Sequence, residues 1–439
     1  MSTLAEVALW GTRIGAVSMP DDAGDVATFQ YAPAFLASGI EVSPLTMPLR
    51  AAPYSFPALN PESFRGLPGL LSDSLPDRFG HALIDAWLAG QGRSPESFDS
   101  VERLCYVGRR GMGALEFAPS RGPRPSASHD LDVAELVELA SEVLSDREGL
   151  IASLAAGHRE QAMRDILSVG TSAGGARAKA VIAWNPATDV VRSGQVDDLG
   201  PGFEHWLLKF DGVVGNRDKD RLADPKGYGA VEYAYSLMAR DAGIEISDTR
   251  LFEENGRRHF MTRRFDRGEN GAKRHMQTLG ALAHYDFNQA GAYSYEQVFL
   301  ILRQLGQPAA VVEQMFRRMA FNIVARNQDD HVKNIAFLMD RRGRWRLAPA
   351  YDVTYAYRPE SRWTSQHQMT ANGKRDGFTL EDFDACGDAA RLPRGRATRI
   401  VDEVRDVVAE WDDYAERAAV DEDHMRRIAT ALRLSLPRD

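Results

Sequence analysis

The alternation of apolar and polar residues predicts a mixed α/β structure in the first region of the chain, residues 1–125. Its opening stretch, VALWGTRIGAVSM, has strand-like residues on both sides of Gly11 and Thr12, which is typical of a β-hairpin. Apolar residues at helical spacing follow in PDRFGHALIDAWLAG and SVERLCYVG, and GALEFAP is typical of a last strand. The stretch APSRGPRPSASHD, rich in proline and small polar residues, then indicates a boundary, so we expect an N-terminal α/β subdomain.

The second region, residues 126–268, is predicted to contain a sheet. It begins with a helix, DVAELVELASEVL, whose apolar residues recur every three or four positions. The next stretch, ILSVGTSAGGARAKAVIAW, is strand-like at both ends and rich in glycine between them. Further strands are expected at HWLLKF and RHFMTRRF, with the helix AVEYAYSLMARDAG between them.

The third region, residues 269–439, is predicted to be mostly helical. Helical spacing runs through SYEQVFLILRQL, VVEQMFRRMAFNIVAR, RATRIVDEVRDVVAEWDDYAERA and DEDHMRRIATALRL. One interruption, IAFLMDRRGRWRLAPAYD, is typical of a hairpin that turns between Arg341 and Gly343. A sheet-rich unit followed by a helical unit with one inserted hairpin resembles a protein kinase. The pattern therefore predicts a two-lobed, kinase-like α/β (α+β) fold.

Composition narrows the class of protein. The chain has 439 residues, of which 44% are hydrophobic and 26% are charged, and this is an ordinary globular composition. No run approaches the roughly 18 apolar residues of a membrane span, and the first residues do not resemble a signal peptide. Its two cysteines, Cys105 and Cys386, are far apart, which excludes a disulfide framework. We expect a cytoplasmic protein without membrane contact, and the formal net charge of −9 argues against one that coats nucleic acid.

The densest polar cluster, NQDDHVKN at residues 327–334, follows a predicted buried helix. Asp329 and Asn334 have the spacing D-x-x-x-x-N, and the predicted hairpin after them ends at Asp352 in PAYDV. Phosphoryl transfer needs these residue types, because one carboxylate orients the attacking hydroxyl while an amide and a second carboxylate supply oxygen ligands to Mg²⁺. The cluster therefore predicts a phosphoryl-transfer site.

Two other interpretations of the cluster stay open. The segment can simply cap the helix and turn the chain. A metallohydrolase is the other alternative; its ligands would be Asp329, Asp330, His331 and Asp352. Consecutive residues point in different directions, and no H-x-H or H-E-x-x-H motif supports a metal site of that kind.

The glycine-rich stretch SVGTSAGGARAK matches no standard phosphate-binding motif. Gly170 and Gly175 have Walker A spacing, but Ala176 and Arg177 stand where that motif needs Lys and Ser or Thr. The stretch is either a plain tight turn or a loop whose backbone N–H groups face an anion.

Several ordered motifs resemble the HipA family of bacterial serine/threonine kinase toxins. They are S-x-G-G-A-R-x-K, the lysine strand WLLKF, RRFDR, D-D-H-x-K-N and Y-D. In the first region FQYAPAFLASG, LLSDSLPDRFG and YVGRRGMGALEF are also similar to the family. The resemblance covers nearly the whole chain and implies a kinase N-lobe at 126–268 and a helical C-lobe at 269–439.

The resemblance also implies roles for individual residues. Asp329 would accept the proton of the substrate hydroxyl, Asn334 and Asp352 would hold Mg²⁺, and Ser172 would be the autophosphorylated serine. Lys209 in WLLKF would reach the α- and β-phosphates, and Glu232 is a candidate ion-pair partner for it. The residues implied at the ATP site are Gly174, Gly175, Ala176, Arg177, Ala178, Lys179, Lys209, Arg263, Arg264, Phe265, His331, Val332, Lys333, Asn334, Tyr351 and Asp352.

The function implied is that of an ATP-dependent serine/threonine kinase, the toxin of a toxin–antitoxin pair. The resemblance suggests an aminoacyl-tRNA synthetase as the phosphorylated protein. It also suggests a HipB-like helix-turn-helix antitoxin, through which operator DNA is mainly contacted. Two alternatives remain: a kinase of the same fold that acts on a small molecule or lipid head group, and a non-catalytic regulator that binds antitoxin or DNA.

Overall fold

The computed structural model describes residues 3–20, 26–123, 129–145, 160–170, 177–196, 198–213, 226–268 and 271–438. The chain forms two compact units. The first comprises Met1–Pro225, Phe252–Asp286 and Leu338–Arg344, and the second comprises Lys226–Leu251, Phe287–Phe337 and Trp345–Asp439. Within the described residues no helix is both long and apolar enough to span a membrane.

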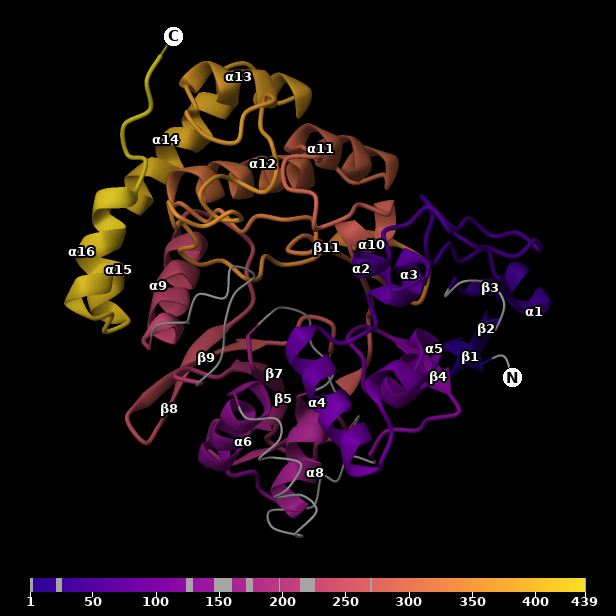
Figure 1. The fold of residues 1–439 in the computed structure, drawn as a ribbon. Helices are drawn as coiled ribbons and strands as arrows, with labels where there is room; N and C mark the ends of the chain where they lie inside the picture. The colour runs from indigo at the N-terminus through magenta and orange to yellow at the C-terminus, as the bar shows by residue number, and fades with distance from the viewer. Residues whose placement is uncertain are drawn as a thin grey trace. The chain divides into compact units, whose positions relative to one another are not determined.

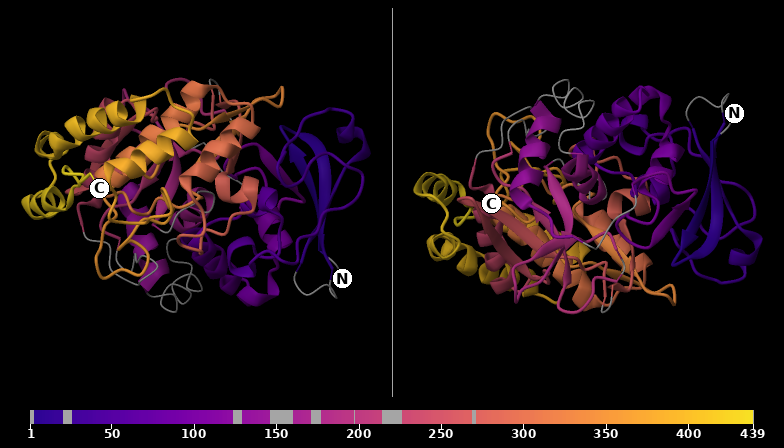
Figure 2. Two further views of the ribbon diagram at one scale, coloured as in Figure 1. Left: turned by 90° about the horizontal axis from the view of Figure 1, so that it is seen from above. Right: turned by 90° about the horizontal axis from the view of Figure 1, so that it is seen from below.

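The first unit opens with a four-stranded antiparallel sheet of order β3-β2-β1-β4. Its strands are β1 (Thr3–Leu9), β2 (Thr12–Met19), β3 (Thr28–Tyr31) and β4 (Leu115–Ala118). The turn between β1 and β2 places Gly11 at a φ of 77°, as expected for the hairpin indicated by the sequence. In both views of Figure 2 the indigo strands form one layer with the purple helices of the same region beside it.

Short helices connect these strands. They are α1 (Pro33–Leu36), α2 (Pro61–Phe64), α3 (Gly69–Ser72), α4 (Arg78–Gly90), the 3₁₀ turn η1 (Pro95–Ser97) and α5 (Ser100–Val107). The two longer ones, α4 and α5, are capped at their N-termini by Asp77 and Asp99, whose carboxylates accept the N–H groups of Gly80 and Glu102. Both helices match the stretches in which the sequence showed helical spacing.

A second, five-stranded sheet has the order β6-β5-β7-β9-β8. Its strands are β5 (Lys179–Trp184), β6 (Val191–Ser193), β7 (Glu204–Lys209), β8 (Thr249–Glu254) and β9 (Arg257–Arg263). In the antiparallel pairing of β5 with β7, Lys179 lies opposite Lys209. The turn from β8 to β9 is Asn255-Gly256, both with positive φ, which is the preferred sequence for a tight hairpin.

One face of this sheet packs on α6 (Val133–Ser145), α8 (Glu160–Val169) and α4. Phe79 and Leu83 of α4 belong to the same buried cluster as Ile166 of α8 and Ala180 of β5. The N-terminal region therefore shares a hydrophobic core with the sheet. The expectation that ILSV is strand-like was wrong, because these residues form the last turn of α8, where Ile166, Leu167 and Val169 are buried. Short apolar runs fit either structure, and here the amphipathic helix before them decides.

The first unit also contains β10 (His275–Thr278) and α10 (Leu279–Ala283). The predicted hairpin is present as β11 (Ala336–Met339) and β12 (Trp345–Leu347). It turns where Gly343 has a φ of 78°. The hairpin predicted to turn between Arg341 and Gly343 is therefore present.

The second unit is mostly helical. It contains α9 (Tyr228–Asp241), α11 (Tyr295–Gln304), α12 (Ala309–Val324), α13 (Leu380–Ala389), α14 (Arg396–Ala409), α15 (Trp411–Arg417) and α16 (Glu422–Ala431). Helix α12 packs against α11, α13 and α14 (Figure 1), and most of its residues are buried. The single helix expected over RATRIVDEVRDVVAEWDDYAERA is instead two helices, which meet at Glu410.

Candidate active site

The loop at residues 327–334 begins where α12 ends. Arg326 has a φ of 58°, in the left-handed region, which turns the chain out of the helix. Its guanidinium donates to the carbonyl of Ala431 in α16 at 2.7 Å. The side-chain amide of Asn327 donates to Oδ1 of Asn322 in α12 at 2.9 Å. These contacts fix the start of the loop against two helices, so the helix-ending interpretation accounts for Asn327.

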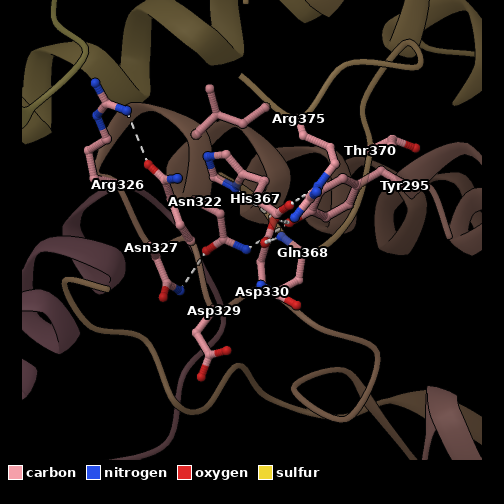
Figure 3. A network of polar contacts seen from close by, with 12 residues as sticks. Tyr295, Asn322, Arg326, Asn327, Asp329, Asp330, His367, Gln368, Thr370 and Arg375 are labelled. Carbon is pink, nitrogen blue, oxygen red and sulfur yellow. Dashed lines mark hydrogen bonds and ion pairs between the residues drawn. The ribbon is translucent and has the colours of Figure 1, made fainter. Parts of the chain in front are cut away.

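Asp330 is the buried carboxylate of the loop. Its side chain is 1% exposed. It accepts hydrogen bonds from the Tyr295 hydroxyl at 2.7 Å, from Nδ1 of His367 at 2.9 Å and from the backbone N–H of Gln368 at 2.8 Å (Figure 3). Arg433 donates to Nε2 of His367 at 2.9 Å, so Nδ1 carries the proton that Asp330 accepts.

This network keeps Asp330 ionised. Burial by itself raises the pKa of Asp330, but His367 and the hydrogen bonds from Tyr295 and Gln368 outweigh burial, so the pKa lies below its ordinary value. A buried carboxylate whose oxygens already accept hydrogen bonds within the fold is not available to bind a substrate. Asp330 therefore holds the loop in place.

Asp329 has the opposite environment. Its side chain is 46% exposed, and Figure 3 shows it turned away from the network around Asp330. Its carbonyl accepts Nδ2–H of Asn334 at 2.8 Å, and its Oδ1 lies 3.8 Å from Nε2 of His331. The Asp329 carboxylate is thus open to a hydroxyl group brought to the loop.

The divergence of neighbouring side chains argues against the metallohydrolase alternative. The carboxylates of Asp329 and Asp330 point in different directions (Figure 3), as expected for consecutive residues. Among the residues that the structure describes, no group of three His, Cys, Asp or Glu side chains could hold a metal ion.

Asn334 and Asp352 line one small cavity of about 30 Å³, together with His331 and Tyr351. Such a volume holds one or two water molecules. Nδ2 of Asn334 donates to the Asp329 carbonyl, which leaves the amide oxygen as the atom for a ligand. Asp352 has a φ of 53°, a strained conformation of the kind that clusters at functional sites. One amide oxygen and one carboxylate fit Mg²⁺, which takes its other ligands from water and phosphate.

The residues around this pair are tied to one another. The Tyr351 hydroxyl donates to the carbonyl of Lys333 at 2.5 Å, which joins the end of the hairpin to the loop. Nζ of Lys333 lies 4.9 Å from the ring centroid of Phe287. Because the Val332 side chain is buried, Val332 would contact a nucleotide through its backbone. His331 accepts the N–H of Lys333 at Nδ1, 3.3 Å away.

The predicted autophosphorylation site Ser172 and the predicted phosphate-loop residues Gly174, Gly175 and Ala176 lie outside the described residues. Beyond them Arg177 is half-buried and Ala178 is buried. Nζ of Lys179 lies 3.2 Å from Oδ2 of Asp77. Lys209 is half-buried on β7, with Nζ 5.6 Å from the ring centroid of Phe260.

The predicted adenine hinge contains a buried ion cluster. Arg264 donates two hydrogen bonds to Asp266, at 2.9 and 2.7 Å, and Arg267 donates a third at 2.6 Å. Burial raises the pKa of Asp266, but the two guanidinium groups outweigh it and lower that pKa. Arg263 is exposed and pairs with Glu204. The Arg264 side chain therefore has a structural role.

The backbone of the hinge residues is partly engaged as well. The Arg264 N–H donates to the carbonyl of His205, and the Phe265 carbonyl accepts from Arg274. The assignment of residues 263–265 to adenine stays a prediction, as does the pairing of Glu232 with Lys209. Glu232 itself is buried on α9.

Sequence reasoning missed the residues that support the site. His367 and Tyr295 were given no role, although they hold Asp330, and their distance from it in sequence left no local signal. Asp77 lies in LLSDSLPDRFG and was given no role either. In the structure it is the N-cap of α4, a position that an aspartate at the start of a helical pattern could have indicated.

Comparisons with known proteins identify relatives of this chain. The HipA-like C-terminal domain matches residues 171–411, more than half of the chain, and the HipA N-terminal domain matches residues 5–118. A protein named putative kinase Y4mE, from Sinorhizobium fredii, is 26% identical over 437 residues, which cover 91% of this chain and 90% of that protein. A putative kinase from Haemophilus influenzae is 28% identical over 134 residues, 28% of this chain and 39% of that protein.

A solved structure is similar over nearly the whole chain. It is HipA of Shewanella oneidensis, in a complex with HipB and its operator DNA, with a TM-score of 0.68, 18% identity, and coverage of 98% of this chain and 94% of that chain. The predicted fold class is thereby confirmed. Together with the relatives named as kinases, the family models indicate a kinase of the HipA type. The chain belongs to the HipA family.

Proposed function

We propose that this chain is an ATP- and Mg²⁺-dependent serine/threonine protein kinase and the toxin of a toxin–antitoxin pair. The observation that carries the proposal is the arrangement of three side chains with oxygen atoms, those of Asp329, Asn334 and Asp352. Asn334 and Asp352 line one cavity. The side-chain amide of Asn334 donates a hydrogen bond to the backbone carbonyl of the partly exposed Asp329. A proton acceptor beside two metal ligands is what phosphoryl transfer requires.

In the proposed reaction the substrate hydroxyl attacks the γ-phosphorus of ATP, the bond from that phosphorus to the β,γ-bridging oxygen breaks, and ADP leaves. The Asp329 carboxylate accepts the hydroxyl proton. Mg²⁺ would neutralise charge on the β- and γ-phosphates. The Asn334 amide oxygen and the Asp352 carboxylate are the protein groups that would hold it. Lys209 would contact the α- and β-phosphates, and Asp330 keeps Asp329 in position.

A protein substrate and a HipB-like partner belong to the same proposal. The Shewanella oneidensis HipA structure contains HipB and operator DNA, and this supports a helix-turn-helix antitoxin for the present chain. The formal net charge of −9 favours operator contact mainly through that partner. An aminoacyl-tRNA synthetase is the proposed target, and Ser172 is the proposed site of autophosphorylation.

The test is transfer of label from ATP with a labelled γ-phosphate. Wild type, Asp329→Asn and Asp388→Asn are incubated with Mg²⁺ and cell extract, and label is followed in protein, lipid and small molecules. Asp388 is an exposed carboxylate of α13 and serves as the matched control. We expect protein labelling by wild type and Asp388→Asn and loss of it in Asp329→Asn. Label confined to lipid or small molecules would contradict the protein-kinase proposal. Mass spectrometry of the labelled bands identifies the target and reports on Ser172.

A further inference from the structure

Helix α4 of the N-terminal region contacts the chain on both sides of residues 171–176. On the first side is Gly170. A Cβ placed on it would lie 2.6 Å from Cδ1 of Leu83 and 3.2 Å from Cε1 of Phe79, both in α4, and 2.8 Å from the carbonyl of Ile166. These distances leave no room for a side chain. The backbone at Gly170 therefore rests directly on α4.

On the second side is Lys179, the first residue of β5. Its Nζ lies 3.2 Å from Oδ2 of Asp77, and the two side chains are 2% and 8% exposed. Lysine is almost never buried to this degree unless it is paired. Asp77 is the N-cap of α4, where its Oδ1 accepts the N–H of Gly80 at 3.0 Å. One carboxylate thus caps the helix and binds the lysine.

The sheet register places a second lysine beside Lys179, so the negative charge of Asp77 also reduces repulsion between two lysines. Lys179 lies directly opposite Lys209 in the antiparallel pair of β5 and β7, so both side chains leave the same face of the sheet. Like charges in that position are destabilising. The negative charge of Asp77 offsets one of the two lysines.

We propose that Asp77 is a positioning residue for the nucleotide phosphates: through Lys179 it fixes the start of β5 to α4. The inference rests on the proposed ATP-dependent function and extends it, because it gives the N-terminal region a part in nucleotide binding. Asp77 does not touch the nucleotide. It acts by holding Lys179 and by balancing the charge beside Lys209.

The first experiment compares ATP and adenosine binding by titration calorimetry in wild type and Asp77→Asn. Asparagine caps a helix as well as aspartate does, so this change removes the charge and keeps the cap. We expect ATP to bind roughly tenfold or more weakly, since hydrogen bonds between charged groups contribute at least that factor. Adenosine, which lacks the phosphates, should bind as it does to wild type.

Asp99→Asn is the matched control. Asp99 is the N-cap of α5 in the same region, and its carboxylate accepts the Glu102 N–H and the Thr3 hydroxyl. The Asp99→Asn variant should bind ATP and adenosine as wild type does. Asp77→Glu, which keeps the charge, should recover most of the ATP affinity.

A double variant keeps the test valid if Asp77→Asn unfolds. Replacing both partners of a buried ion pair is often tolerated, so the double variant Asp77→Asn, Lys179→Met should fold and bind ATP as weakly as Lys179→Met alone. Wild-type ATP affinity in Asp77→Asn or in the double variant would overturn the inference. So would an equal loss of ATP and adenosine binding in Asp77→Asn, because that is the result of a purely structural role. Wild type that binds no ATP would instead overturn the proposed function.

Discussion

Two polar segments, one in each unit, are supported in different ways. In the loop at residues 327–334, the supporting carboxylate Asp330 is the immediate neighbour of Asp329, and its partner His367 lies 37 residues further on, in the same unit. At the start of β5, Lys179 is held by Asp77, which lies 102 residues away in sequence. The supporting carboxylate of the first segment lies within the segment and is bonded to residues of its own unit, whereas that of the second comes from the N-terminal region.

In the proposed site, burial separates the supporting residues from the proposed reacting residue. Asp330 and Lys179 are each almost fully buried and each is bonded to partners inside the fold, whereas Asp329 is 46% exposed. Buried polar groups are held in place by such partners. The predictions below test this division, beginning with the largest expected effect.

Asp352→Ala should remove the effect of Mg²⁺ on ATP binding and lower phosphate transfer by about 10³-fold or more, because a metal ion supplies several kcal/mol of charge stabilisation. ATP is titrated into wild type and variant with and without Mg²⁺. Asp340→Ala, at the tip of the same hairpin, is the control and should keep the Mg²⁺ effect. An equal gain in affinity from Mg²⁺ in wild type and Asp352→Ala would disprove the metal assignment.

Asp330→Asn should lower the free energy of unfolding by about 3–5 kcal/mol, because hydrogen bonds to a charged group contribute about 1.5–3 kcal/mol each and the amide cannot accept all three. Oδ2 accepts both Tyr295 and His367 while Oδ1 accepts the Gln368 N–H. An amide has one acceptor oxygen, so its NH₂ must face a donor. Denaturant unfolding measures the change, with the exposed Asp388→Asn as control. A loss below 1 kcal/mol would show that the network does not hold the loop.

Two buried histidines and the half-buried His284 should make the folded state less stable as the pH falls. Burial lowers the pKa of His205, His275 and His284 to about 4, from 6.5. Between pH 6.5 and 4 the unfolded chain binds protons that the folded chain does not, so stability is lost as pH falls through this window. The cost is about 1–2 kcal/mol per histidine at pH 5.

Urea unfolding from pH 7.5 to 5 measures this slope. His284 is the best single probe, because its Nε2 accepts the N–H of Gly69 at 3.0 Å and protonation would break that bond. His284→Gln keeps an acceptor and cannot titrate, so its slope should be shallower. A slope identical to that of wild type would exclude His284 as a contributor.

Arg426→Ala should have the smallest effect, a change in unfolding free energy below about 0.5 kcal/mol. Arg426 pairs with Glu422 and Asp423 on the surface of α16, and all three side chains are more than two-thirds exposed. Solvent screens such pairs. A loss above 1 kcal/mol in thermal unfolding would mean that exposure does not rank the ion pairs of this protein.

Local patterns predicted much of the fold from sequence. Each correctly predicted element has a periodicity or a turn signal that acts over a few residues. Examples are the Gly11 hairpin, helices α4 and α12 and the hairpin after residue 334. The strand β8 was missed although Asn255-Gly256 is a strong hairpin signal. The break at Glu410 was missed because the apolar spacing continues across it.

The same limit applies to the site. The D-x-x-x-x-N spacing singled out Asp329 and Asn334, which a hydrogen bond joins within one loop. It could not assign Asp330 to the interior, because that depends on Tyr295, His367 and Gln368 arriving from elsewhere in the chain. The Asp77–Lys179 pair spans a still longer separation, and nothing near Lys179 in sequence indicates it.

Single-turnover phosphate transfer in Asp329→Asn and Asp330→Asn, at a temperature where both are folded, tests the division between these neighbours most directly. Asp329→Asn should lose roughly 10²- to 10⁴-fold in rate, as general-base variants do, with an unchanged unfolding midpoint. Asp330→Asn should stay within about tenfold of the wild-type rate and unfold at lower denaturant. Equal rate losses in the two variants, or a wild-type rate in Asp329→Asn, would contradict the assignment of chemistry to Asp329 and of support to Asp330.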